Sequence, residues 1–157
     1  MKSDDYYLSL AVEIAAKYSY SGENGPFGAV IVKDNKIIAE GWNEVVKSHD
    51  PTAHAEIVAI RKACKTLDSF SLTGCTIYSS CEPCPMCLSA IIWARIDRVV
   101  YAEGREAAAN AGFDDQKIYH AIEERQLQEI VQMERIKVDS SIAPFKAWLS
   151  NPLRKKY

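Results

Sequence analysis

The sequence carries PTAHAE at residues 51–56 and EPCPMC at residues 82–87, and each stretch lies at the start of a predicted helix. The first stretch contains a His and a Glu two positions apart, and the second contains two Cys three positions apart. A Cys-x-x-Cys pair that opens a helix can present two thiolates to one metal ion, because the helix amino terminus favours their negative charge. Together the stretches predict a metal site at the starts of two helices.

The expected metal ligands are His54, Cys84 and Cys87. Three protein ligands are typical of a catalytic zinc site, because the fourth position must hold the water that reacts. Zinc lowers the pKa of that water to about 7 and so supplies hydroxide at neutral pH. Glu56 lies close to the site without being needed as a ligand, which suits a carboxylate that moves protons from water to substrate. The pattern therefore predicts zinc-assisted hydrolysis with Glu56 as a catalytic residue.

Two other interpretations involve Cys81. In one, Cys81 is a fourth ligand, which makes the zinc site structural because no position remains for water. In the other, Cys81 and Cys84 form a redox pair, an arrangement that gives His54 and Glu56 no role. Replacing Cys81 by Ser separates the first alternative from the catalytic site, because a structural site would lose its zinc.

Helices and strands alternate along the rest of the chain. Apolar periodicity and capping residues predict helices at about 8–18, 53–67, 85–93 and 141–149, with short helices around Gly112 within 106–121. Strands are predicted over 27–32, 36–42, 75–80, 98–102 and 129–138, the first two joined at Asp34-Asn35. This order predicts one α/β domain over residues 1–157, a three-layer α/β/α sandwich with a mixed five-stranded sheet.

Composition excludes several classes of protein. The chain has 48% hydrophobic residues but no run of twenty apolar ones, so no membrane association is expected. It begins with Lys, Ser and two Asp rather than with a secretory signal, so we expect a cytoplasmic protein. Five cysteines in a reducing compartment are typical of core residues or metal ligands. The formal net charge of −2 does not favour nucleic acid, and it indicates a small-molecule substrate.

These motifs resemble the cytidine deaminase-like superfamily of zinc-dependent nucleobase deaminases, and within it the chain is similar to bacterial guanine deaminases along nearly its whole length. The similar segments are GPFGAV (25–30), DPTAHAE (50–56), SCEPCPMC (80–87), AGFDD (111–115) and the PFxAW pattern at 144–148. The zinc motifs are shared with cytosine and tRNA-adenosine deaminases, whereas the Gly-Phe-Asp-Asp segment and a carboxyl-terminal Tyr are similar to the guanine enzymes specifically. The resemblance implies hydrolysis of guanine to xanthine and ammonia.

The resemblance also implies substrate contacts. Asn43 is expected to hydrogen-bond the purine, Phe27 and Trp93 to line the ring pocket with Ala55 nearby, and Asp115 to contact the guanine edge and assist proton transfer. Each residue has a structural alternative, because aromatic residues often belong to the core and Asn often belongs to a turn. An Asp in the 114–115 pair can equally cap the following helix, and the sequence does not say which of the two faces substrate.

The carboxyl-terminal tail, about residues 150–157, is expected to cover an active site. In similar enzymes this segment crosses to the partner subunit, so the resemblance implies a domain-swapped homodimer in which Tyr157 closes the partner's site. The charged ending at 154–156 is also typical of a solvated terminus.

Three rival functions remain open from the sequence. A tRNA adenosine deaminase has the same zinc motifs but reads a flipped base in a polynucleotide, which requires a basic surface. An acidic group also suits the donor-rich edge of guanine better than the acceptor on the corresponding edge of adenine. The other rivals are a deaminase of cytosine or another aminoheterocycle, and a noncatalytic zinc-stabilised module, which leaves Glu56 without a role.

Overall fold

The computed structural model describes residues 2–113, 115–136 and 138–155. It contains a mixed sheet with the strand order β2-β1-β3-β4, in which β1 is antiparallel to β2 and β3, and β4 is parallel to β3. The strands are β1 (Gly28–Lys33), β2 (Lys36–Trp42), β3 (Cys75–Cys81) and β4 (Arg98–Glu103). The helices are α1 (Asp4–Ser19), α2 (Val45–Ser48), α3 (Ala55–Thr66), α4 (Pro85–Trp93), α5 (Arg105–Asn110), α6 (Asp115–Glu123), the 3-10 helix η1 (Leu127–Glu129) and α7 (Ala143–Ser150). The predicted α/β class with a mixed sheet is confirmed.

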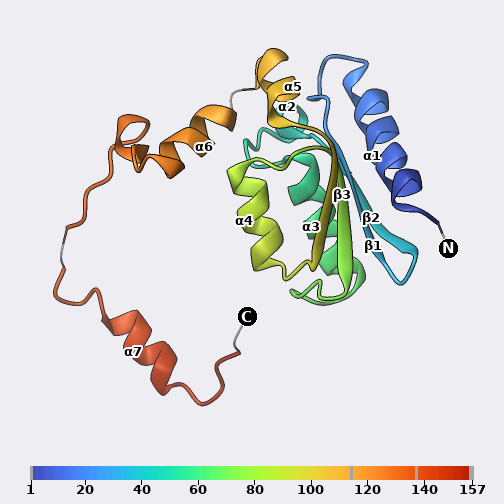
Figure 1. Ribbon diagram of the computed structural model, residues 1–157. Coiled ribbons are helices and arrows are strands. Elements are labelled where there is room, and N and C mark those ends of the chain that lie inside the picture. Colours follow the sequence, from blue (N-terminus) through green and yellow to red (C-terminus); the bar gives the residue numbers. More distant parts are fainter. Residues whose placement is uncertain (1, 114, 137, 156–157) are drawn as a thin grey trace.

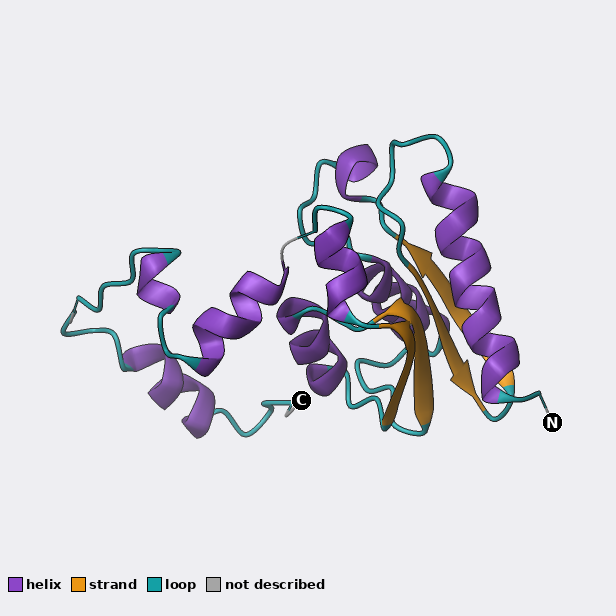
Figure 2. Ribbon diagram, turned by 45° about the horizontal axis from the view of Figure 1, so that its top comes forward, coloured by secondary structure: helices purple, strands orange, loops and turns teal. Residues whose placement is uncertain are grey.

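Helices cover both faces of the sheet, as Figures 1 and 2 show. Alternate residues of β1 and β3 face opposite layers, as the period of two in a strand requires. Ile31 and Ile77 pack in the core beneath α3 and α4, whereas Val30 and Tyr78 pack in the core beneath α1. The result is the expected three-layer α/β/α arrangement, with one apolar core on each side of the sheet.

Two glycines allow the helices to approach the sheet closely. A Cβ built on Gly41 would collide with the carbonyl oxygen of Ala55 at the start of α3. A Cβ built on Gly28 would collide with the carbonyl oxygen of Ala11 in α1, on the opposite face. The contact at Gly41 matters for the site described below, because it fixes the height of the α3 amino terminus above the sheet.

The hairpin between β1 and β2 turns at Asp34 and Asn35, as predicted. Both residues have positive φ, 49° and 60°, which is the conformation that a tight two-residue hairpin turn requires. Asn and Asp adopt this conformation more readily than other residues with a Cβ. The short turn pairs Lys33 with Lys36, and the register of the two strands shifts by one residue between Ile31 and Val32.

The fifth strand, predicted over residues 129–138, is wrong for the described part of that segment. It contains the end of η1 and then irregular chain, and residue 137 lies outside the described residues. The apolar spacing of the segment suits a strand, but a strand also needs a neighbour that satisfies its backbone hydrogen bonds. The segment lies apart from β4, the edge strand on that side of the sheet, so this pairing is not made (Figure 1).

Residues 124–136 and 138–155, which we call the C-terminal arm, lie for most of their length apart from the sheet and its covering helices (Figures 1 and 2). The arm exposes many large apolar side chains: Leu127, Ile130, Val131, Met133, Ile136, Val138, Ile142, Phe145, Trp148, Leu149 and Leu153. A monomeric protein rarely exposes so much apolar surface in one segment. In the parts of the chain that the structure describes, no helix has the length and apolar character needed to cross a membrane.

Candidate metal centre and adjoining pocket

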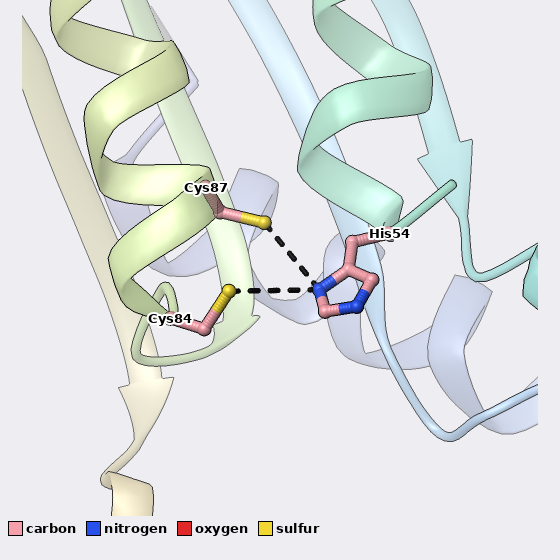
Figure 3. A group of neighbouring side chains, drawn as sticks. All are labelled: His54, Cys84 and Cys87. Atoms are coloured by element: carbon pink, nitrogen blue, oxygen red, sulfur yellow. Dashed lines mark hydrogen bonds between the residues drawn. The ribbon is translucent and has the colours of Figure 1, made fainter. Parts of the chain in front are cut away.

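Two helix amino termini converge at the predicted metal site. His54 is the N-cap residue of α3 and Glu56 lies in its first turn. Cys84 is the N-cap residue of α4, Pro85 begins that helix without needing an N–H donor, and Cys87 follows in the first turn. Figure 3 shows the imidazole of His54 pointing toward both sulfurs across the gap between the two helices. The two sequence stretches therefore meet as predicted.

The geometry of this cluster fits a zinc ion. His54 Nδ1 lies 3.6 Å from Cys84 Sγ and 3.5 Å from Cys87 Sγ, and the three ligand atoms all lie within 4.8 Å of one another. With Zn–S near 2.3 Å and Zn–N near 2.0–2.1 Å, a tetrahedral ion separates nitrogen from sulfur by about 3.5 Å. The observed separations match that value, so His54, Cys84 and Cys87 could hold zinc and leave one coordination position for water.

The protonation of the two thiols also suits a metal site. The pKa of Cys84 is lowered to about 4, chiefly by the hydrogen bond from the Cys87 thiol and also by His54. The pKa of Cys87 is raised, because its thiol donates to Cys84 and because it is buried. The hydrogen bond with Cys84 also raises the pKa of His54. A divalent cation would replace the proton of Cys87, and both sulfurs would then bind as thiolates.

Cys81, the fourth ligand of the alternative structural site, is turned away from this cluster. Its thiol donates to the carbonyl oxygen of Gly104 at 3.5 Å, and burial raises its pKa to about 11. In the described chain the metal-ligating group comprises His54, Cys84 and Cys87 without Cys81. The arrangement therefore favours a site with an open position.

Glu56 is buried beside the sulfurs. Its Oε1 accepts a hydrogen bond of 3.4 Å from the Ser79 hydroxyl, and its Oε2 lies 3.4 Å from Cys87 Sγ. Burial raises the pKa of its carboxyl group above the ordinary value. A carboxylate in this environment can accept a proton from a nearby water and release it again, which is the behaviour required of a proton shuttle.

A pocket opens over the cluster. Its lining includes His54, Glu56, Phe27 and Asn43, which the sequence analysis had proposed as site residues. The Phe27 ring meets the Phe113 ring edge to face, with 4.9 Å between ring centres. Aromatic walls with a few convergent polar groups are typical of a pocket for a flat heterocycle.

Asn43 lies buried in the pocket wall with a fixed orientation. Its Oδ1 accepts hydrogen bonds from the backbone N–H groups of Gly25, at 3.3 Å, and Val45, at 3.2 Å. Among the described residues these bonds occupy the oxygen, so the Nδ2 group is the part of Asn43 that can donate to a ligand. The turn role and the binding role of Asn43 are therefore compatible.

Asp115 begins α6 and lines the same pocket. Its Oδ1 is buried and has no hydrogen-bond partner among the described residues. Burial raises the pKa of its carboxyl group, and the nearby negative charge of Cys84 raises it further. A buried carboxylate oxygen without a partner is costly unless a ligand or water donates to it. Asp114, the alternative residue, lies outside the described residues.

Two of the expected substrate contacts, Trp93 and Ala55, do not line the pocket. Trp93 lies on the exposed end of α4, away from Cys84 and Cys87, with the Arg95 guanidinium over its ring. Ala55 is fully buried in the first turn of α3, where its carbonyl group faces Gly41. Tyr157 lies outside the described residues.

Three residues that line the pocket had no predicted role: Glu82, Ala108 and Phe113. Glu82 and Phe113 lie inside sequence motifs that were quoted above, so those motifs were the available signal, whereas Ala108 lies outside them. Glu82 directly precedes the Pro-Cys pair, and its hydrogen bonds with Arg105 hold its pKa below the usual range. Neither Glu82 nor Phe113 could be placed in the pocket from spacing alone, because each depends on a contact with a distant segment.

Comparison with known proteins agrees with this geometry. Residues 1–103 match the family model of the cytidine and deoxycytidylate deaminase zinc-binding region. The chain is 49% identical to guanine deaminase of Bacillus subtilis, over 96% of this chain and 97% of that enzyme. It is 40% identical to tRNA-specific adenosine deaminase of Haemophilus influenzae, over 76% of this chain and 72% of that enzyme. It superposes on the crystal structure of the Bacillus subtilis guanine deaminase with a TM-score of 0.92 and 48% identity, covering 99% of both chains. The chain therefore belongs to the zinc-binding cytidine and deoxycytidylate deaminase family.

Proposed function

We propose that this chain is a zinc-dependent guanine deaminase that converts guanine and water to xanthine and ammonia. The observation that carries the proposal is that similarity to the Bacillus subtilis enzyme continues well past residue 103 and spans Phe113 and Asp115. Those residues line the pocket beside the metal ligands. The guanine edge offers an N1–H and an amino group, both of which can donate to the unpartnered oxygen of Asp115.

The pocket residues account for the steps of this reaction. His54, Cys84 and Cys87 would hold the zinc ion, which when bound would activate a water at neutral pH. Glu56 would take one proton from that water as its oxygen adds to C2, and would deliver this proton to the adjacent ring nitrogen. It would then take the remaining proton from the new C2 hydroxyl and deliver it to the amino group, so that the bond between C2 and the amino nitrogen breaks and xanthine and ammonia are formed. The buried position of Glu56 excludes bulk water from this transfer.

The remaining residues orient the base. Phe27 and Phe113 form an aromatic corner against which a purine ring can pack. The Nδ2 group of Asn43 donates to a ring acceptor, and Asp115 accepts from the guanine edge. Adenine presents an acceptor where guanine presents N1–H, so the carboxylate of Asp115 disfavours it.

The 40% identity with a tRNA-specific adenosine deaminase supports a second candidate activity. That match covers a smaller share of this chain than the match with the guanine enzyme. The two candidates share the metal centre and differ in the substrate that enters the pocket, so a direct comparison of substrates separates them.

The test is ammonia release by the zinc-loaded protein with guanine, cytosine, adenine and a tRNA anticodon stem-loop. Conversion of guanine alone is expected. Glu56→Gln keeps the shape of the side chain and is expected to retain zinc while losing about 100- to 10,000-fold in kcat, because general acid-base catalysis contributes that much. Activity on the stem-loop or cytosine without activity on guanine would refute the substrate assignment, and a near-normal Glu56→Gln rate would refute the proton shuttle.

We further propose a domain-swapped homodimer in which the C-terminal arm covers the partner's active site. The arm exposes apolar side chains throughout its length, and α4 exposes Ile92 and Trp93. The superposition on the solved Bacillus subtilis chain covers 99% of both chains with a TM-score of 0.92, which supports the extended position of the arm. Pairing of the arm with a second copy would bury these side chains and bring the tail at 150–157 to a pocket.

Mixed dimers test the shared site. One chain carries Glu56→Gln with an intact arm, and the other has a normal core but lacks residues 150–157. If each tail completes the partner's site, the co-expressed pair regains one working site per dimer although each chain alone is nearly inactive. A mixed dimer that stays inactive, or a monomeric mass in light scattering, would refute the swap.

A further inference from the structure

Arg105, the first residue of α5, joins three segments beside the pocket. Its Nη2 lies 2.6 Å from Glu82 Oε1, and its Nε lies 3.2 Å from Glu82 Oε2. The backbone N–H of Arg105 also donates to Glu82 Oε2 at 3.3 Å. A two-pronged guanidinium–carboxylate pair fixes direction as well as distance, and this one is only partly exposed.

The same guanidinium lies over the ring of Tyr119 in α6, with its central carbon 4.0 Å from the ring centre. The Tyr119 hydroxyl donates to the carbonyl oxygen of Pro83 at 2.6 Å. Pro83 directly precedes the metal ligand Cys84. Arg105 and Tyr119 therefore form two links between α6 and the loop that carries the ligand.

These links bear on Asp115, because residues four apart lie on the same side of a helix. Asp115 is four residues before Tyr119 and begins the helix that Tyr119 anchors. The chain beyond α6 is the exposed arm, so it does not hold α6 against the body from the other end (Figure 1). The position of Asp115 therefore depends on the anchoring of α6 at the pocket.

The ion pair also separates the roles of the pocket carboxylates. Glu56, Glu82 and Asp115 all line the pocket, and each could accept a hydrogen bond from a substrate amino group. Both oxygens of Glu82 are engaged by Arg105, whereas Oδ1 of Asp115 has no partner among the described residues. Arg105 thus keeps Glu82 from competing with Asp115 for the donors of the substrate.

We propose that Arg105 is a positioning residue for Asp115, acting through its ion pair with Glu82 and its contact with Tyr119. The inference rests on the proposed function for the role of Asp115, but the anchoring of α6 can be measured without substrate. Arg105 touches neither the metal ligands nor the substrate, so its replacement leaves zinc binding intact and misplaces the recognition carboxylate.

The test is Arg105→Leu, which keeps an alkyl chain and removes the guanidinium. We expect full zinc content, faster amide hydrogen exchange at residues 115–123, and kcat/KM for guanine lowered by about 10- to 100-fold, because a displacement of about 1 Å costs roughly 100-fold. The matched control is Arg98→Leu, which removes a similar two-pronged pair with Asp4 far from the pocket and is expected to keep both exchange and activity near those of the parent protein.

A double-mutant cycle with Asp115→Asn separates positioning from general stability. If Arg105 acts through Asp115, Arg105→Leu causes little further loss in the Asp115→Asn background. Multiplicative losses, zinc loss in Arg105→Leu, or unchanged exchange at 115–123 would each overturn the proposal.

Tyr119→Phe removes only the bond to Pro83 and provides a milder variant that should shift exchange in the same direction. If the parent protein does not deaminate guanine, the proposed function fails, whereas the exchange measurement still decides whether Arg105 anchors α6.

Discussion

Replacing Gly41 by Ala tests how the sheet positions the metal site. A Cβ at Gly41 would collide with the carbonyl oxygen of Ala55 and would lie 2.7 Å from the backbone nitrogen of Ala59. An ordinary contact begins at 3.4 Å, so α3 must move away from the sheet by at least about 0.7 Å. Both atoms belong to backbone, which cannot rotate away as the end of a flexible side chain can. The strain is therefore transmitted to the helix as a whole.

This movement reaches the metal ligand directly, because His54 caps the helix that is displaced. Ligand distances in a metal site are tolerated within about 0.2 Å, which is much less than the required shift. We expect Gly41→Ala to lower the free energy of unfolding by about 1–3 kcal/mol, as overpacking typically does. We also expect zinc affinity to fall by at least about 10-fold, as when the support of a metal ligand is removed.

Gly28→Ala is the matched control on the opposite face. Its Cβ would collide with the carbonyl oxygen of Ala11 and would lie 2.7 Å from the backbone nitrogen of Ala15, which repeats the same clash against α1. That helix carries no metal ligand, so the control should lose similar stability and keep its zinc affinity. The assays are denaturant unfolding of the zinc-loaded proteins and competition for zinc with a chelating dye. Equal zinc affinity in the two variants, at equal loss of stability, would refute the view that Gly41 sets the position of His54.

Two further predictions concern other residues of the core. Cys81→Ser is expected to retain one zinc per chain, measured by metal analysis, because the Cys81 thiol bonds to Gly104 rather than facing His54; zinc loss would indicate a four-ligand structural site. Burial and the hydrogen bond to Asp4 raise the pKa of Tyr78 to about 12, so unfolding should release its proton and stability should fall as the pH rises from about 10 to 12. Tyr78→Phe should show a weaker fall over that interval in denaturant unfolding, and an identical pH dependence would contradict the raised pKa.

Local patterns allowed most of the fold and the metal centre to be predicted. The hairpin at Asp34 and Asn35 depends on the conformational preferences of two adjacent residues. The ligands His54, Cys84 and Cys87 lie at helix starts, whose positions follow from capping and periodicity. Only the meeting of the two helices depends on tertiary structure, and the shared chemistry of the ligands made that meeting predictable.

The failures involve contacts between distant segments. The segment at 129–138 has a strand-like apolar pattern, but the pattern does not indicate whether a neighbouring strand lies within reach. The contact of Trp93 with substrate stays a prediction, and spacing alone does not show that this residue lies at the far end of α4 from the metal ligands. Glu82 could not be placed either, because its position in the pocket wall depends on an ion pair with Arg105, 23 residues later.

The residues of the metal centre and some of the residues that line the pocket lie in different parts of the sequence. The family match ends at residue 103, and it contains the residues that could hold zinc and Glu56, the residue proposed as the proton shuttle. Phe113 and Asp115 follow that boundary and approach the same pocket from α6 and the turn before it. Changes after residue 103 can therefore alter which base fits the pocket while the zinc site stays intact. Because α6 is anchored through Arg105 and leads into the exposed arm, substrate choice in this chain depends on tertiary contacts that the metal motifs do not specify.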